Sequence, residues 1–239
     1  MLSKKKDIWI VISLCVLAFY IVFMIYPLGI LFKNAVIENN GDFTFAYFAK
    51  FLSKNYYFST IFNSFKVSLA ATALTLIIGT PLAYFYNMYK IKGKTFLQII
   101  IILCSMSAPF IGAYSWILLL GRNGLITNTI KNLTGFNFPS IYGFGGILLV
   151  LCMQLYPLVF LYVSGALRNI DNSLLEASEN MGCTGTKRFF KIIIPLCIPT
   201  ILAAALMVFM RAFADFGTPL FIGEGYRTFP VEIYNQFMN

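Results

Sequence analysis

The sequence predicts an all-α membrane protein, a polytopic bundle of helices that cross the bilayer. Of the 239 residues, 59% are hydrophobic and only 11% are charged. A soluble globular domain has roughly 25% charged residues, so water is not the main solvent of this chain. The apolar residues also gather into long uninterrupted runs. A helix needs about 20 such residues to cross the hydrocarbon core of a bilayer.

Five apolar runs are predicted to be the spans. Four of them contain no charged residue, and the fifth is shorter and begins at a boundary marked by prolines. Runs of this length without alternation are typical of helices, because barrel strands are only about ten residues long and alternate in hydrophobicity. We expect Pro81, Pro109 and Pro157 to kink their spans, which helix bundles in membranes tolerate. The predicted spans are Ile8–Phe32, Val67–Tyr89, Thr95–Leu120, Ile141–Leu167 and Ile192–Met210.

The positive charge of the chain is distributed as expected for a cytoplasmic N-terminus. The net charge is +9 with no histidine. A nucleic-acid partner would require a basic, solvated face, and the chain has too few polar stretches to build one. In membrane proteins Lys and Arg collect in cytoplasmic loops. Ten of the 18 Lys and Arg residues fall in segments that such a start places inside: Lys4, Lys5, Lys6, Lys90, Lys92, Lys94, Arg168, Lys187, Arg188 and Lys191.

The five cysteines predict neither a disulfide framework nor a metal site. Four of them lie inside apolar runs, where cysteine behaves as a small hydrophobic residue. Cys183 lies in a charged loop that we place in the reducing cytoplasm. No CxxC motif or Cys/His cluster occurs, so we expect no structural zinc.

The longest cytoplasmic loop, residues 168–195, carries the strongest functional pattern. Gly182 stands where a left-handed residue would end a first short helix, and Thr184 is expected to cap a second one. Two short helices that meet at a glycine would form a compact projection from the membrane. The spacing i, i+3, i+4 and i+7 predicts one face of the first helix: Leu174, Ala177, Ser178 and Met181.

This loop resembles the coupling motif of ABC importer permeases: Glu-Ala-Ala, three residues, Gly, nine residues, then Ile-x-Leu-Pro. Here the triplet is Glu-Ala-Ser, Gly182 follows after three residues, and nine more lead to Ile-Ile-Ile-Pro. The departures are Ser178 for Ala and Ile194 for Leu. The resemblance implies that the loop docks on a separate ATPase. The residues it assigns to coupling are Glu176, Ala177, Ser178, Gly182, Ile192, Ile194 and Pro195.

Glu176 also has a purely local interpretation. It stands three residues after Ser173, the spacing of a capping box, which would stabilise the start of the helix. Taken alone, Glu176 is therefore as well explained by helix capping as by docking. The functional prediction rests on the whole pattern between these two spans.

The resemblance covers most of the chain from Asn63 onward. Ala108–Trp116 with Gly121–Gly124, and Ala166–Asp171, are similar to further patterns of the same permeases. The resemblance implies the transmembrane domain of a type I ABC importer, with residues 1–239 as a single permease domain. Members of this class have at least six spans, so we expect five here and a sixth beyond a truncated C-terminus.

The partners follow from the same resemblance. It implies an ABC ATPase dimer, an extracytoplasmic solute-binding protein and a second permease half, fused or separate, in a bacterial inner membrane. No GxxxxGK[ST] loop is present, so ATP and Mg are expected in the partner ATPase, with no cofactor in this chain. We expect no catalytic residue, no resident metal and no enzymatic activity in this chain.

The segment after the fifth span carries a pattern that is relevant to the identity of the transported solute. Ala214–Gly223, followed by Tyr226-Arg-Thr and Glu232-Ile-Tyr, resembles the ferric-iron branch of these permeases. The polyamine, thiamine, sulfate and phosphonate branches share most of these features and stay open as alternatives. A secondary transporter driven by an ion gradient is the alternative from another class. It would need paired ionisable residues within the membrane and usually internal repeats.

Four polar residues in or near the apolar spans are candidates for the solute path: Gln154, Tyr156, Arg211 and Asp215. A polar group within a bilayer costs several kcal/mol unless it is paired or faces water. Arg211 and Asp215 are four residues apart and could pair on one helix face, or Asp215 could face the solute. Gln154 could contact the solute or donate a hydrogen bond to a neighbouring helix.

Overall fold

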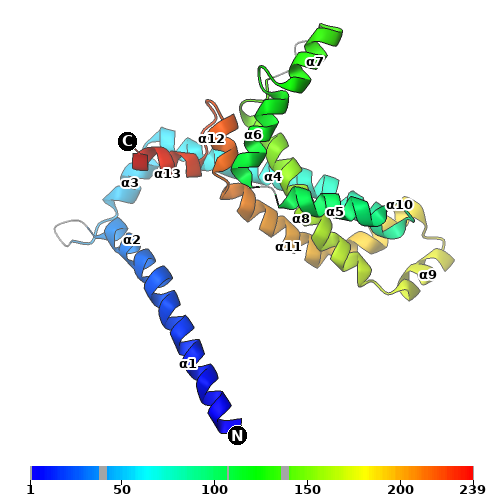
Figure 1. The fold of residues 1–239 in the computed structure, drawn as a ribbon, viewed down its shortest axis with the longest axis horizontal. Coiled ribbons are helices and arrows are strands. Elements are labelled where there is room, and N and C mark those ends of the chain that lie inside the picture. The colour runs from blue at the N-terminus through cyan, green and yellow to red at the C-terminus, as the bar shows by residue number, and fades with distance from the viewer. Residues whose placement is uncertain (1, 38–41, 107, 136–139, 239) are drawn as a thin grey trace. The chain divides into compact units, whose positions relative to one another are not determined.

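The computed structural model is helical throughout the part of the chain it describes, residues 2–37, 42–106, 108–135 and 140–238 (Figure 1). Outside the helices, the described residues contain one isolated antiparallel β-bridge between Ile37 and Phe43. The prediction of an all-α membrane protein is therefore confirmed. The chain divides into two compact units, residues 1–58 and 59–239.

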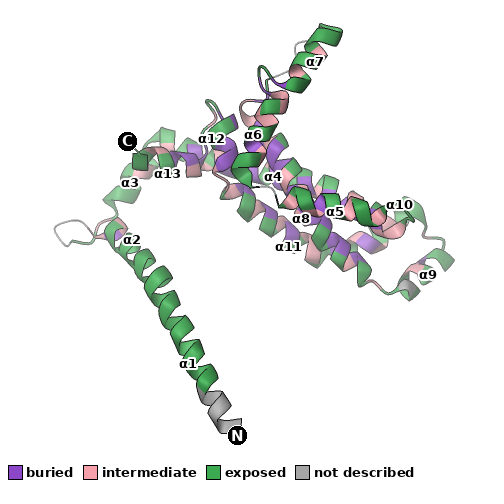
Figure 2. Ribbon diagram, viewed as in Figure 1, coloured by how far each residue is buried: buried purple, intermediate pink, exposed green. Residues whose placement is uncertain are grey.

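The first unit consists of one long apolar helix and a short one. Helix α1 (Leu2–Tyr20) continues through a π-helical turn, η1 (Ile21–Ile25), into α2 (Tyr26–Val36). Helix α3 (Ala46–Ser53) follows. Every side chain of the predicted first span from residue 8 to residue 32 is exposed, as the green ribbon in Figure 2 shows. An apolar helix with this exposure needs a lipid environment.

The second unit holds the remaining helices. The bounds of α4 differ from those predicted for its span, because the helix begins twelve residues before Val67. The elements of the second unit are α4 (Asn55–Met88, which starts at the junction of the units), α5 (Lys94–Ser105), α6 (Pro109–Leu120), α7 (Leu125–Thr134), α8 (Phe144–Arg168), α9 (Asn172–Asn180), α10 (Gly185–Arg188), η2 (Phe189–Ile193), α11 (Ile194–Phe213), α12 (Gly217–Ile222) and α13 (Phe229–Met238).

Helices α4, α8 and α11 supply most of the buried core of this unit. Figure 2 shows buried residues concentrated on α8, whose Ile147, Val159 and Phe160 are fully enclosed. On α4 the buried positions are mostly small or hydroxyl-bearing, which lets helix backbones approach closely. Three of these hydroxyls donate to carbonyls of their own helix, so burying them leaves no unpaired proton. They belong to Ser68, Thr72 and Thr75.

Four helical segments are long and apolar enough to cross a membrane, and a fifth crossing results if α5, α6 and α7 count as one broken span. The run Thr95–Leu120, expected as a single span, is in fact divided. Its two parts are bent by 105° relative to each other. The cause is local, because proline disfavours helical geometry in the residue before it. Accordingly Ala108 is extended and Pro109 begins α6.

The helices of the second unit are arranged so that its two ends differ (Figure 1). Helices α9 and α10 join α8 to α11 at one end, and α6, α7, α12 and α13 lie at the other. The second end is fastened by long-range hydrogen bonds. The Phe229 N–H donates to Ser64 Oγ at 2.7 Å, and Asn63 Nδ2 donates to the Arg227 carbonyl at 3.0 Å.

Gly79 tests the packing of α4 against α8. A Cβ at this position would lie 2.8 Å from Cβ and Cγ1 of Val159. Gly79→Ala is therefore expected to destabilise the protein by about 1–3 kcal/mol through overpacking. Gly165→Ala on α8 is the matched control, because nothing lies within 4 Å of its added Cβ. Thermal unfolding in detergent, followed by circular dichroism, compares the two. Equal unfolding temperatures would contradict the packing described here.

Candidate functional site

The helical hairpin formed by α9 and α10 has a defined start. Asp171 is the N-cap of α9, and its carboxylate accepts the backbone N–H of Ser173 at 3.0 Å. This hydrogen bond lowers the pKa of Asp171 below its ordinary value, because it stabilises the charged form. The capping box considered for Ser173 and Glu176, as the alternative to a docking role for Glu176, is thus wrong. Ser173 lies inside the helix, because Asp171 is already extended and occupies the cap position.

The turn between the two helices has the geometry expected from its glycine. Gly182 has φ +73°, the left-handed region that side chains rarely adopt. Its N–H donates to the Glu179 carbonyl at 2.9 Å, and the next N–H, of Cys183, donates to the Ser178 carbonyl at 2.9 Å. These bonds satisfy carbonyls in the last turn of α9 and close the helix.

Helix α10 runs into α11 through η2, so the second helix of the hairpin and the following span form one continuous helical segment, Gly185–Phe213. Thr184 occupies the predicted cap position of α10, but its side chain makes no capping hydrogen bond. A salt bridge of 3.6 Å between Arg188 and Glu179 joins the two helices of the hairpin. Phe189 contacts Tyr84 of α4, with ring centroids 4.6 Å apart.

Some residues of the coupling motif are buried in the structure, and others are exposed at its surface. Ser178 is 1% exposed, and its hydroxyl donates to the Leu175 carbonyl at 2.7 Å, so it packs the hairpin together. Ile192 and Ile194 are half-buried beside the buried Ile193. The exposed members, which are available to a docking partner, are Glu176, Ala177, Gly182 and Pro195.

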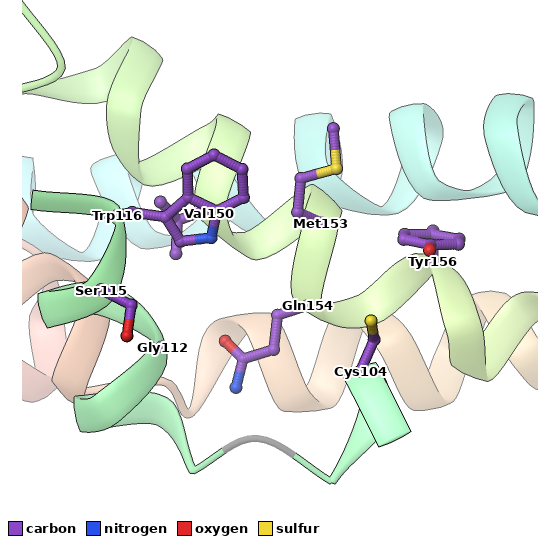
Figure 3. A pocket seen from close by; sticks show the side chains of 8 residues that line it. All are labelled: Cys104, Gly112, Ser115, Trp116, Val150, Met153, Gln154 and Tyr156. Atoms are coloured by element: carbon purple, nitrogen blue, oxygen red, sulfur yellow. The ribbon is translucent and has the colours of Figure 1, made fainter. Parts of the chain in front are cut away.

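A second candidate site lies where α5 ends and α6 begins. Figure 3 shows the Gln154 side chain of α8 extending toward the space between Cys104, at the end of α5, and Ser115 on α6. The cavity lined by these residues has a volume of about 270 Å³, and Tyr156 and Trp116 also line it. Non-helical backbone at membrane depth is tolerated where it is buried in protein or lines a cavity.

Two neighbouring cavities extend this space toward α11. One, of about 290 Å³, is lined by Gln154, Arg211, Asp215 and Pro109 at the start of α6. The other, of about 240 Å³, is lined by Gln154, Arg211 and Ser105 at the end of α5. The structure thus brings Gln154, Arg211 and Asp215 to one cavity and places Tyr156 with Gln154 in another.

Of the two alternatives for Arg211 and Asp215, the pairing on one helix face does not form: among the described residues neither joins an ion pair. Helix α11 ends at Phe213, so Asp215 lies beyond the helix and the i, i+4 geometry does not apply. The Asp215 carboxylate instead accepts the N–H of Thr218 at 3.1 Å, near the start of α12. The interhelical hydrogen bond considered for Gln154 is likewise absent from the described part of the chain.

The division of the third span is the feature of this site that sequence reasoning missed. The prolines indicated kinks, but Pro109 marks a complete break, and the cavities lie beside that break. The signal was present in Ser105-Met-Ser-Ala-Pro109, where two serines and a proline interrupt an otherwise apolar run.

Comparison with known proteins identifies the class. The family of binding-protein-dependent transport system inner membrane components matches residues 75–239. The match covers the α9–α10 hairpin and the residues that line the cavities. The chain belongs to this family of inner membrane components, and its long apolar helices agree with a multi-pass membrane protein.

Individual relatives differ in the solutes that their names state. A ferric transport system permease protein of Actinobacillus pleuropneumoniae is 28% identical over 98% of this chain, which spans 34% of that relative. A candidate 2-aminoethylphosphonate transport permease of Salmonella typhimurium is 24% identical over 98% of this chain and 82% of its own length. A solved bacterial alginate ABC transporter, in complex with its pentasaccharide-bound periplasmic protein, superimposes with a TM-score of 0.76 at 18% identity over 98% of this chain and 84% of that one.

The N-cap of α9 gives a pH-dependent prediction. The folded-state pKa of Asp171 is depressed, so the capping contribution is present above the unfolded-state pKa and is lost as the pH falls through the folded-state pKa. At neutral pH, Asp171→Ala is expected to lower the hydrogen-exchange protection of amides 173–177. Asp171→Asn is the control and should retain most protection, because its side-chain oxygen also caps.

The measurement is hydrogen exchange by mass spectrometry in nanodiscs, expressed as protection factors over a pH series. The protection of the wild type should approach that of Asp171→Ala as the pH falls. Wild-type protection in Asp171→Ala at neutral pH would show that the cap does not hold α9.

Proposed function

We propose that this chain is the permease subunit of an ATP-driven importer and is coupled through its α9–α10 hairpin to a separate ATPase. The observation that carries the proposal is the hairpin itself. The motif residues Glu176, Ala177 and Gly182 are exposed at its surface, while Ser178 packs it internally. The hairpin also joins α8 directly to α11, and both helices line the cavities. A displacement of the hairpin by the ATPase would therefore be transmitted through α8 and α11 to the cavities that we propose as the solute path.

The orientation follows from the charge of the loops. The hairpin and the segment at Lys90, Lys92 and Lys94 are basic, which favours the cytoplasmic side. An ATPase dimer that binds ATP and Mg would dock there, and the N-terminus would be cytoplasmic. A solute-binding protein would dock at the opposite end, and a second permease half would complete the path. The periplasmic partner seen with the alginate transporter supports this arrangement. No catalytic group is assigned to this chain.

The solute that we propose is ferric iron. The support is the similarity of Ala214–Gly223 to ferric permeases and the name of the Actinobacillus relative. Phosphonate is the second candidate, favoured by the name of the Salmonella relative, which this chain matches over more of its length. Polyamine, thiamine and sulfate have only the general likeness of the family in their favour.

The secondary-transporter alternative has lost its structural support. It required a pair of ionisable residues within the membrane, and the pair offered by the sequence was Arg211 with Asp215. Asp215 instead accepts a backbone N–H near α12, at 3.1 Å. Uptake that stops on ATP depletion, and survives an uncoupler, would agree with the proposed importer.

Gly182 provides the test of coupling. Gly182→Arg should abolish the ATP hydrolysis that the solute-loaded binding protein stimulates, while the protein stays in the membrane. The reasons are that the left-handed backbone disfavours a side chain by about 1–2 kcal/mol and that a long charged group would project from the docking surface.

Gly182→Asn is the matched control, because asparagine tolerates the left-handed region and its side chain is short. It should keep most of the stimulated hydrolysis. ATP hydrolysis is measured on the complete transporter in proteoliposomes, with membrane insertion checked by immunoblotting. Normal stimulation in Gly182→Arg would refute the role of the hairpin.

A further inference from the structure

The three cavities beside the broken span share their polar lining. Gln154 lines all three, and Arg211 lines the two that lie nearest α11. These residues come from different helices, α8 and α11, and the ends of α5 and α6 complete the walls with Ser105 and Pro109. A solute that passes the break would therefore meet Gln154 and Arg211 together.

The charges at these cavities do not cancel locally. Of the residues that line them, Arg211 and Asp215 carry formal charges. The Asp215 carboxylate is engaged by the Thr218 N–H at 3.1 Å. Across the residues that the structure describes, Arg211 has neither an ion pair nor a hydrogen bond, and its side chain is open to the cavities. Asp215 lines only one of these cavities, so in the cavity beside Ser105 and Gln154 the formal charge of the lining is that of Arg211 alone.

Among the polar groups at the cavities, Arg211 offers the most hydrogen-bond donors, whereas the serine hydroxyls are left with their oxygens as acceptors. The hydroxyl protons of Ser105 and Ser115 are already donated to carbonyls of their own helices, at 2.7 and 2.8 Å. The Gln154 amide keeps two N–H donors, and the Arg211 guanidinium has five donors in a planar fork. This fork matches the oxygens of a carboxylate, sulfate, phosphate or phosphonate.

We infer that Arg211, assisted by Gln154, is a specificity-determining residue that selects solutes bearing an oxyanion. The inference rests on the proposed importer function and narrows its solute class. Phosphonate and sulfate satisfy it directly. Ferric iron satisfies it when the metal travels as an anionic chelate, with carboxylate oxygens of the chelator facing Arg211. Polyamines and thiamine, which are cations, do not satisfy it, because the guanidinium would repel them.

The test is ATP-driven uptake into proteoliposomes that contain the complete transporter with its binding protein. The probes are ferric citrate, 2-aminoethylphosphonate, sulfate, spermidine and thiamine, each assayed separately, so that the sources of the oxyanion are distinguished. The wild type should accumulate at least one of the first three and neither of the last two. Arg211→Gln should reduce that uptake about tenfold or more, because charge-assisted hydrogen bonds are lost.

Three further variants separate recognition from folding. Arg211→Lys keeps the charge and should retain part of the uptake, whereas Arg211→Glu reverses the charge and should remove it. Lys50→Gln is the control, because Lys50 lies on α3 in the first unit, outside the three cavities, and its loss should leave uptake near the wild-type level. Basal ATP hydrolysis should be the same in all variants, which reports an assembled transporter.

The outcomes distinguish the two proposals. Uptake that does not depend on ATP would overturn the importer function itself. ATP-dependent uptake that is unchanged in Arg211→Gln, or accumulation of spermidine or thiamine, would leave the importer intact and overturn the role of Arg211. Failure to accumulate any of the three oxyanion-bearing probes would also count against it.

Discussion

Wherever lipid surrounds the chain, its backbone N–H and C=O groups must find partners within the protein, and the rest of this structure depends on that constraint. Helices α4, α8 and α11 meet it with their own hydrogen bonds. Helix α5 ends at Ser105 and α6 begins at Pro109, with Ala108 extended before it, because proline lacks an N–H and disfavours helical geometry in the preceding residue. Such a break is tolerated beside a cavity, and all three cavities lie next to it. The broken span and the three cavities therefore lie at one place in the fold.

Helices α8 and α11 connect these cavities to the α9–α10 hairpin. Helix α8 leads into α9 after a short turn, and α10 passes into α11 through η2 without interruption. Ile193 and Cys197 are buried where α11 begins, so this end is held against the core. A π-helical turn is a common device at functional positions. The hairpin is thus connected along the chain to α8, which carries Gln154, and to α11, which carries Arg211.

Much of the fold could be predicted from the sequence, because apolar run length is set by bilayer thickness. The glycine at the hairpin turn was equally readable, since Gly182 has the left-handed φ that the pattern required. Caps and breaks were harder to predict. Asp171 rather than Ser173 caps α9, because several polar residues compete for one position and backbone geometry decides between them. At Pro109 the sequence indicated a kink, and whether a proline kinks or divides a span depends on tertiary packing.

The lack of an ion pair between Arg211 and Asp215 shows how the end of a helix can leave a charge unpaired. Had α11 continued for one more turn, the two side chains would have shared a face and could have neutralised each other. The helix ends at Phe213, and the unpaired N–H groups that begin α12 supply partners for the carboxylate instead. Those donors are fixed by the backbone, so Asp215 is hydrogen-bonded to α12 although it lines the same cavity as Arg211. The guanidinium is thereby kept free beside the cavities, with a local cap stabilising the nearby negative charge.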